Sequence, residues 1–187
     1  MANIRKAQRN AAGNNKQRGF SLIELLIVVA IIVIIMTMAL PGFRNFQMKG
    51  NETSAMASMK AIREAQIQYQ STYPTKGFAD TLAALGTGGL TNGTTCAPSP
   101  EHACILDSTL SSGVKQGYRF VVQGGTPVNG VNTTFAAGAA PVAYNSSGAR
   151  MFCITSEDSQ LRMDANLGAS TTPPSANVCI SGQFSPM

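Results

Sequence analysis

A long apolar stretch near the N-terminus limits what this chain can fold into more than any other feature. It runs from Phe20 to Leu40, 21 residues among which Glu24 is the one ionisable side chain. A helix rises ~1.5 Å per residue, so this stretch would extend over ~31 Å, which matches the hydrocarbon core of a bilayer. The sequence therefore predicts a membrane-spanning helix that carries one carboxylate.

The charges before the stretch predict its orientation. Five basic residues and no acidic residue precede Phe20. Because basic residues favour the cytoplasmic side, this end is predicted to stay in the cytoplasm and the chain after Pro41 to be exported. The five basic residues are Arg5, Lys6, Arg9, Lys16 and Arg18.

A secretory signal peptide and a plain anchor explain the sequence less well. A signal peptide has a shorter apolar region with small residues at a cleavage site directly after it. The triplet Ala55-Met56-Ala57 has suitable residues but begins 15 residues beyond Leu40. A plain transmembrane anchor remains an alternative, and it gives no reason for Glu24.

The segment "RGFSLIELLIVVAII", residues 18–32, resembles the processing and assembly motif of the type IV filament superfamily, which comprises type IV pilins and the pseudopilins of type II secretion. The shared features are Gly19, the aromatic Phe20, Glu24 at the fifth mature position, an unbroken aliphatic run and Pro41. The resemblance implies that a prepilin peptidase cuts the Gly19–Phe20 bond on the cytoplasmic side and methylates the new amino group of Phe20.

Two physical explanations for Glu24 stay open. A carboxylate at the bilayer centre costs roughly 2.5–3.5 kcal/mol, and less near a helix end, so such residues usually have partners. Cleavage would create a cationic amine on Phe20, and Glu24 of a neighbouring subunit could pair with it and set the axial register. Alternatively, the helix dipole favours a carboxylate near the N-terminus of the helix. Both effects can act together.

Removal of the leader, residues 1–19, changes the charge of the chain. The precursor has 14 basic and 9 acidic residues. Five of the basic residues belong to the leader, so the mature chain is formally neutral. The net charge of +5 thus reflects the leader, and no nucleic-acid partner is predicted.

The helix is predicted in two parts, residues 20–41 for the membrane and assembly and residues 42–73 as an amphipathic half. In the second part, residues at alternating spacings of four and three share one face. This face consists of Ala55, Met59, Ile62, Gln66, Tyr69 and Tyr73. Pro74 predicts a stop at Tyr73, while Pro41-Gly42 and Gly50 predict local melting or bending.

The rest of the chain predicts a loop followed by a sheet. Residues 74–116 are expected to form a loop with one short helix at "FADTLAAL", and residues 117–187 about four antiparallel strands and a disulfide-bonded tail. The strands are predicted at "GYRFVVQGG", "FAAGAAPVAYNSSG", "ARMFCITS" and "QLRMD". The expected fold is α+β, with the lollipop shape familiar from pilins: a long N-terminal helix packed on a small antiparallel sheet.

Four cysteines lie in the segment predicted to be exported, where an even number indicates disulfides. Three pairings can be written. The favoured one joins Cys96 to Cys104, closing a small loop, and Cys153 to Cys179, tying the C-terminal tail to a strand. The sequence has no C-x-x-C and a single histidine, His102, so no metal site and no cofactor is predicted, and His102 is expected to be a solvated loop residue.

No catalytic group is predicted either. The glycine-rich "GTGGLTNG" lacks the lysine of a phosphate-binding loop, and "DANLG", residues 164–168, departs from a calcium loop and is expected to be a turn. No serine, histidine and acid set can be placed from the sequence. The chain is not expected to be an enzyme.

Two function classes follow from the resemblance. In the first, the chain is a structural subunit of a type IV pilus, major or minor; in the second, it is a type II secretion pseudopilin that polymerises only across the periplasm. The cysteine pairs and the lack of a clear calcium loop favour the pilin. A third class, a simple membrane-anchored binding module, would need none of the Gly19, Phe20 and Glu24 pattern.

The partners and locations implied are those of the superfamily. The expected partners are identical subunits in a helical filament, the prepilin peptidase and an inner-membrane assembly platform. The precursor would lie in the inner membrane, with its leader in the cytoplasm and its C-terminal domain in the periplasm. After assembly, the subunit would belong to an extracellular pilus.

Overall fold

The computed structural model describes residues 19–88, 96–158, 160–166, 168–180 and 183–187. It divides into two units, Met1–Leu40 and Pro41–Met187. One helix, α1 (Leu22–Thr72), contributes to both, and the units are described separately below.

The described part of the first unit is the start of α1 and the residues just before it. Every described residue from Gly19 to Thr37 is exposed, with Leu22 at 82% and Ile32 at 44%. By length and composition, no single helix of the described residues suffices to cross a membrane, whereas Leu22–Thr37 and Gly42–Thr72 meet that test together as a broken pair.

In the second unit, α1 buries the face that the sequence predicts. Ala55, Met59, Ile62, Gln66 and Tyr69 are all at most 3% exposed, and Tyr73 is partly buried. α1 ends at Thr72, where Pro74 follows closely. α1 is not melted at Gly50 in this structure, because the hydrogen bonds of the surrounding turns continue and a glycine costs only ~1 kcal/mol in a helix. Bending at Gly50, and melting in an assembled filament, stay predictions.

The sheet is antiparallel and its strands follow one another in chain order, β1-β2-β3-β4-β5-β6. The described residues give six strands and not about four. Their bounds are β1 (Val114–Lys115), β2 (Tyr118–Gly124), β3 (Phe135–Pro141), β4 (Met151–Thr155), β5 (Arg162–Asp164) and β6 (Ser185–Pro186). The two additional strands, β1 and β6, are edge strands of two residues each, too short to show any alternation.

Three short helices complete the described part of the second unit. They are α2 (Leu82–Leu85), α3 (Ser108–Ser111) and α4 (Ala176–Ile180). Thr81 and Asp107 cap α2 and α3, because each side chain accepts the N–H three residues later. α2 confirms the predicted short helix, although it is shorter than "FADTLAAL"; α3 and α4 were not predicted.

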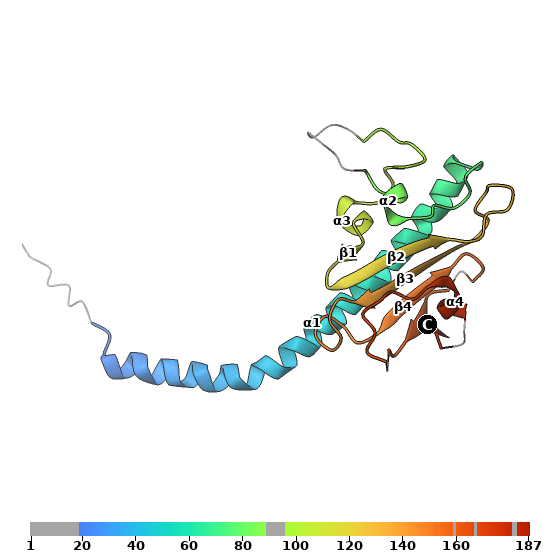
Figure 1. Cartoon of the computed structure of the whole chain (residues 1–187). Coiled ribbons are helices and arrows are strands. Elements are labelled where there is room, and N and C mark those ends of the chain that lie inside the picture. Colours follow the sequence, from blue (N-terminus) through green and yellow to red (C-terminus); the bar gives the residue numbers. More distant parts are fainter. Residues whose placement is uncertain (1–18, 89–95, 159, 167, 181–182) are drawn as a thin grey trace, which may run out of the picture. The chain divides into compact units, whose positions relative to one another are not determined.

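Both faces of the sheet are covered. On one face, Tyr118, Phe120 and Phe152 join the core that includes the buried side of α1. On the other, Cys179 and Phe184 pack with residues of β3 and β4, and Figure 1 shows α4 beside these strands. All seven residues of β3 are therefore buried. Gly138 is required there, since a Cβ would lie 2.3 Å from the carbonyl oxygen of Pro174.

Candidate processing and assembly site

The predicted cleavage point lies in an open segment. Gly19 and Phe20 precede α1, and a Cβ at Gly19 would meet nothing within 4 Å among the described atoms. The Phe20 side chain is 79% exposed. A peptidase could therefore reach the Gly19–Phe20 bond without displacing any described part of the chain.

Glu24 lies in the first turn of α1. The carbonyl oxygen of Ser21 accepts the N–H groups of Glu24 at 3.1 Å and Leu25 at 3.2 Å, which begins the helix. Within the described residues the Glu24 carboxylate forms no hydrogen bond or ion pair and is exposed. The start of α1 thus presents a free carboxylate four residues after Phe20, surrounded by exposed apolar side chains.

The other predicted assembly residue, Pro41, lies within the bounds of α1 and begins the second unit. Proline removes one helical hydrogen bond and strains the preceding turn. The boundary between the two units falls at this residue.

The disulfides have the pairing favoured from the sequence. Cys96 is bonded to Cys104 with Cα atoms 6.1 Å apart, and Cys153 to Cys179 with Cα atoms 5.8 Å apart. Cys153 and Cys179 are both fully buried. The second bond joins β4 to α4 and so holds the C-terminal segment on the sheet.

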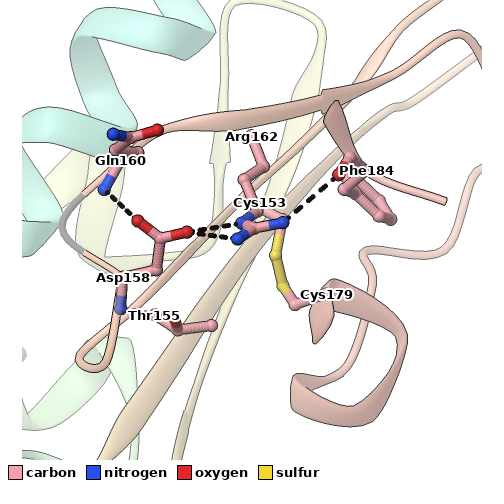
Figure 2. A network of polar contacts seen from close by, with 7 residues as sticks. All are labelled: Cys153, Thr155, Asp158, Gln160, Arg162, Cys179 and Phe184. Atoms are coloured by element: carbon pink, nitrogen blue, oxygen red, sulfur yellow. Dashed lines mark hydrogen bonds and ion pairs between the residues drawn. A yellow bond between two sulfur atoms is a disulfide. The ribbon is translucent and has the colours of Figure 1, made fainter. Parts of the chain in front are cut away.

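A polar network beside this disulfide was missed from the sequence (Figure 2). The Asp158 carboxylate accepts hydrogen bonds from Arg162 and from the N–H of Gln160, while the other side of the Arg162 guanidinium reaches the Phe184 carbonyl oxygen at 3.4 Å. The hydrogen bond from Arg162 lowers the pKa of Asp158. The network ties the β4–β5 connection to the C-terminal segment; its only sequence signal was the spacing of four between acid and base.

The β3–β4 loop is fixed to α1 by two polar side chains. Asn51 donates its amide to the carbonyl oxygen of Ser147 at 2.8 Å. The buried Glu52 carboxylate accepts the N–H groups of Ala149 at 3.0 Å and Arg150 at 3.3 Å. Both anchors lie directly after Gly50, so they hold this part of α1 on the β3–β4 loop.

The remaining candidates have structural positions. His102 is exposed, as expected. Asp164, the last residue of β5, accepts the N–H of Asn166, and the buried Asn166 side chain bonds both N–H and C=O of Ser170, so the described residues that follow β5 form a turn, as predicted. Part of "GTGGLTNG" lies outside the described residues. Among the residues that the structure does describe, no three His, Cys, Asp or Glu side chains gather in a way that could hold a metal ion.

Comparison with known proteins identifies the N-terminal segment. The family described as "Prokaryotic N-terminal methylation motif" matches residues 14–40. The fimbrial protein EcpC of Eikenella corrodens is 31% identical over 113 residues, 59% of this chain and 71% of that protein. The type IV narrow pilus major component PilA5 of Thermus thermophilus is 33% identical over 92 residues, 48% of this chain and 78% of that protein.

The similarity to another relative is confined to a smaller part. The type IV major pilin protein PilA of Myxococcus xanthus is 45% identical over 58 residues, 31% of this chain and 26% of that protein. No solved structure gives a significant match.

A long N-terminal helix with a methylation motif, followed by an antiparallel sheet, defines a pilin-like structural subunit and not an enzyme. The chain belongs to the type IV pilin superfamily.

Proposed function

We propose that the chain is a structural subunit of an extracellular type IV pilus. It is made as a precursor inserted in the inner membrane, cut after Gly19, methylated on the amino group of Phe20, and polymerised through the apolar half of α1. Its partners are the prepilin peptidase, the assembly platform of the inner membrane and identical subunits. The observation that carries this proposal is the methylation motif at residues 14–40.

The surroundings of the motif support the processing step. The Gly19–Phe20 bond is open on all sides within the described chain, and the helix begins only at Leu22. A peptidase needs access to the bond that it cuts, and the exposed residues 19–21 give it that access. Methylation leaves the new amine of Phe20 positively charged.

Glu24 gives the assembly step its register. Were the helix of the mature chain to begin at Phe20, the Phe20 amine would lie ~6 Å from Glu24 along the helix axis, at ~1.5 Å per residue. Pairing between Glu24 of one subunit and the Phe20 amine of the next neutralises both charges where lipid is excluded. The pairing thereby offsets part of the cost that an unpaired carboxylate has in an apolar environment.

Mass spectrometry of sheared surface filaments tests this function. The expected N-terminal peptide begins with N-methylated Phe20, and electron microscopy should show long filaments whose main component is this chain. A mature terminus elsewhere, or an intact leader in assembled material, would contradict the proposal. Processed subunits that never leave the periplasm in long filaments would instead indicate the pseudopilin function.

A further inference from the structure

The second unit has two hollows of opposite charge beside α1. The first, which we name the basic hollow, is lined by Asn45, Met48, Lys49, Glu52, Ala149 and Arg150. Its acid, Glu52, is directed inward, where it accepts two backbone N–H groups and lies 3.9 Å from the guanidinium of Arg150. Lys49 is exposed and has no ion-pair partner within the described residues. The outer surface of this hollow is therefore cationic.

The second, the acidic hollow, lies beside the end of α1 and contains Tyr69, Asp80 and Glu101, with Lys76 as its only cation among the described lining residues. The Tyr69 hydroxyl donates to the carbonyl oxygen of Pro100 at 2.7 Å, which holds the neighbouring Glu101 next to the helix. Burial raises the pKa of Tyr69, and the carboxylates of Asp80 and Glu101 raise it further, as expected where negative charge gathers.

The two carboxylates differ in their availability. Asp80 accepts a hydrogen bond from the amide of Asn132. Glu101 is exposed, and no hydrogen bond or ion pair in the described part of the chain occupies it. Among the described residues, Glu101 is thus the free carboxylate of the acidic hollow and Lys49 the free cation of the basic hollow.

The spacing of the hollows suits contact between copies of the chain. Lys49 and Tyr69 are twenty residues apart in one helix, so the hollows lie ~30 Å apart along its axis at ~1.5 Å per residue. A filament forms through head-to-tail contacts between two different patches of the same subunit. Two patches of opposite charge at different positions along the axis of α1 satisfy this requirement. A symmetric dimer would use the same patch on both subunits and would not extend into a filament.

We propose that Lys49 of each subunit pairs with Glu101 of a neighbouring subunit displaced by ~30 Å along the filament, with Arg150 and Asp80 adding to the attraction between the two hollows. The inference rests on the proposed function, because it names a second contact of the same filament. The occupant of each hollow is another copy of this chain, since the complementary charge is present on the chain itself.

Charge reversal with compensation tests the pair. Lys49→Glu and Glu101→Lys, made singly in cells without a wild-type copy, should each lower the yield of sheared filaments about tenfold, because like charges then meet at every repeat. The double variant Lys49→Glu/Glu101→Lys should recover a yield within about twofold of wild type. The amount of processed subunit should stay unchanged in all three.

A matched control uses exposed charges outside both hollows. Arg119→Glu, Glu157→Lys and their double variant alter the same charges on the second unit and should leave the filament yield near that of wild type. Single variants without effect, or a double variant no better than the singles, would overturn the pairing while wild-type filaments still support the function. Absence of wild-type filaments would overturn both.

Discussion

The two parts of α1 place similar apolar side chains in opposite surroundings. In the first unit, Leu22 and Ile32 are 82% and 44% exposed. In the second unit, Met59 and Ile62 are completely buried against the sheet. The second part of the helix completes its packing with residues of its own chain, and the described first part does not.

This difference indicates where each part obtains its stability. Burial of apolar surface contributes ~25 cal/mol per Å², and a large exposed apolar surface marks a contact with a membrane or another protein. The second unit has its own core, two disulfides and a sheet covered on both faces. The first unit depends on what surrounds it, which in our proposal is lipid before assembly and other subunits afterwards.

The largest effect on filament yield is expected from Gly19→Leu. This variant should block recognition by the peptidase without disturbing the folded chain. A side chain at residue 19 meets nothing within 4 Å of the described chain, so any loss comes from the peptidase and not from packing. The variant should accumulate as a full-length precursor, and filaments should be absent. The mass of the membrane-bound chain measures this result.

Gly42→Leu is the matched control, because a side chain there also meets no described atom within 4 Å. It should be processed like wild type. Normal cleavage of Gly19→Leu would contradict the assigned cleavage bond.

Glu24→Leu is expected to have the next largest effect and tests the first unit alone. The variant should insert and be processed, since the cost of a carboxylate in the bilayer disappears. Its filament yield should nevertheless fall at least about tenfold, because the partner of the Phe20 amine is gone. Glu24→Gln retains the shape and should fall similarly. Quantifying precursor, processed subunit and sheared filaments separates the three steps; normal filaments from Glu24→Leu would favour the helix-dipole explanation.

The fold was predictable where the sequence has long repeating patterns. The buried face of α1 and strands β2, β3, β4 and β5 have enough residues to show a spacing or a β-rich run, and the structure confirms them. β1 and β6 have two residues each, and α3 and α4 have four and five. These four elements have no repeating pattern of their own in the sequence and are fixed by their contacts: Val114 and Lys115 form a strand because β2 is beside them.

The candidate site was predictable for a different reason. Gly19, Phe20 and Glu24 could be identified because a short contiguous motif contains them. The network of Asp158, Arg162 and the Phe184 carbonyl could not, since its members come together only when the C-terminal segment folds over the sheet. The hollows likewise combine residues of α1 with distant loops.

Removal of the Cys153–Cys179 bond tests how self-sufficient the second unit is. The double variant Cys153→Ser/Cys179→Ser should lower the free energy of unfolding by about 3 kcal/mol, because the bond closes a loop between residues 26 apart in sequence. Cys96→Ser/Cys104→Ser, whose residues are 8 apart, should cost less, about 2 kcal/mol. Denaturant unfolding of the detergent-solubilised chain, followed by circular dichroism, measures both. Equal stability of all three proteins would contradict the role assigned to the C-terminal bond.

A smaller effect is expected for Gln66→Leu, which alters one buried polar contact of α1. The Gln66 amide donates to the Ala79 carbonyl oxygen at 3.0 Å and accepts the Ala79 N–H at 2.8 Å. Leucine would leave both backbone groups buried without partners, at a cost of about 2 kcal/mol. Gln70→Leu, on the exposed side of the same helix, should change the free energy of unfolding by less than about 0.5 kcal/mol. Similar values for the two variants would mean that the Ala79 groups find other partners.

The smallest effect concerns the charge at Asp107, which caps α3 in the second unit. The hydrogen bond from the Leu110 N–H, followed by the hydrogen bond and charge of Lys115, lowers the pKa of Asp107 below its ordinary value of 3.8. A carboxylate whose pKa is lowered by folding stabilises the fold at pH values above its pKa in the unfolded chain. This contribution is lost as the pH falls through its pKa in the folded chain. An asparagine at this position would still cap the helix but could not titrate.

Asp107→Asn should therefore be less stable than wild type by under about 1 kcal/mol at neutral pH, since the group is largely exposed. This difference in the free energy of unfolding should shrink toward zero near about pH 2. Denaturant unfolding at the two pH values measures the difference, and a gap that stays constant would show that the Asp107 charge does not contribute.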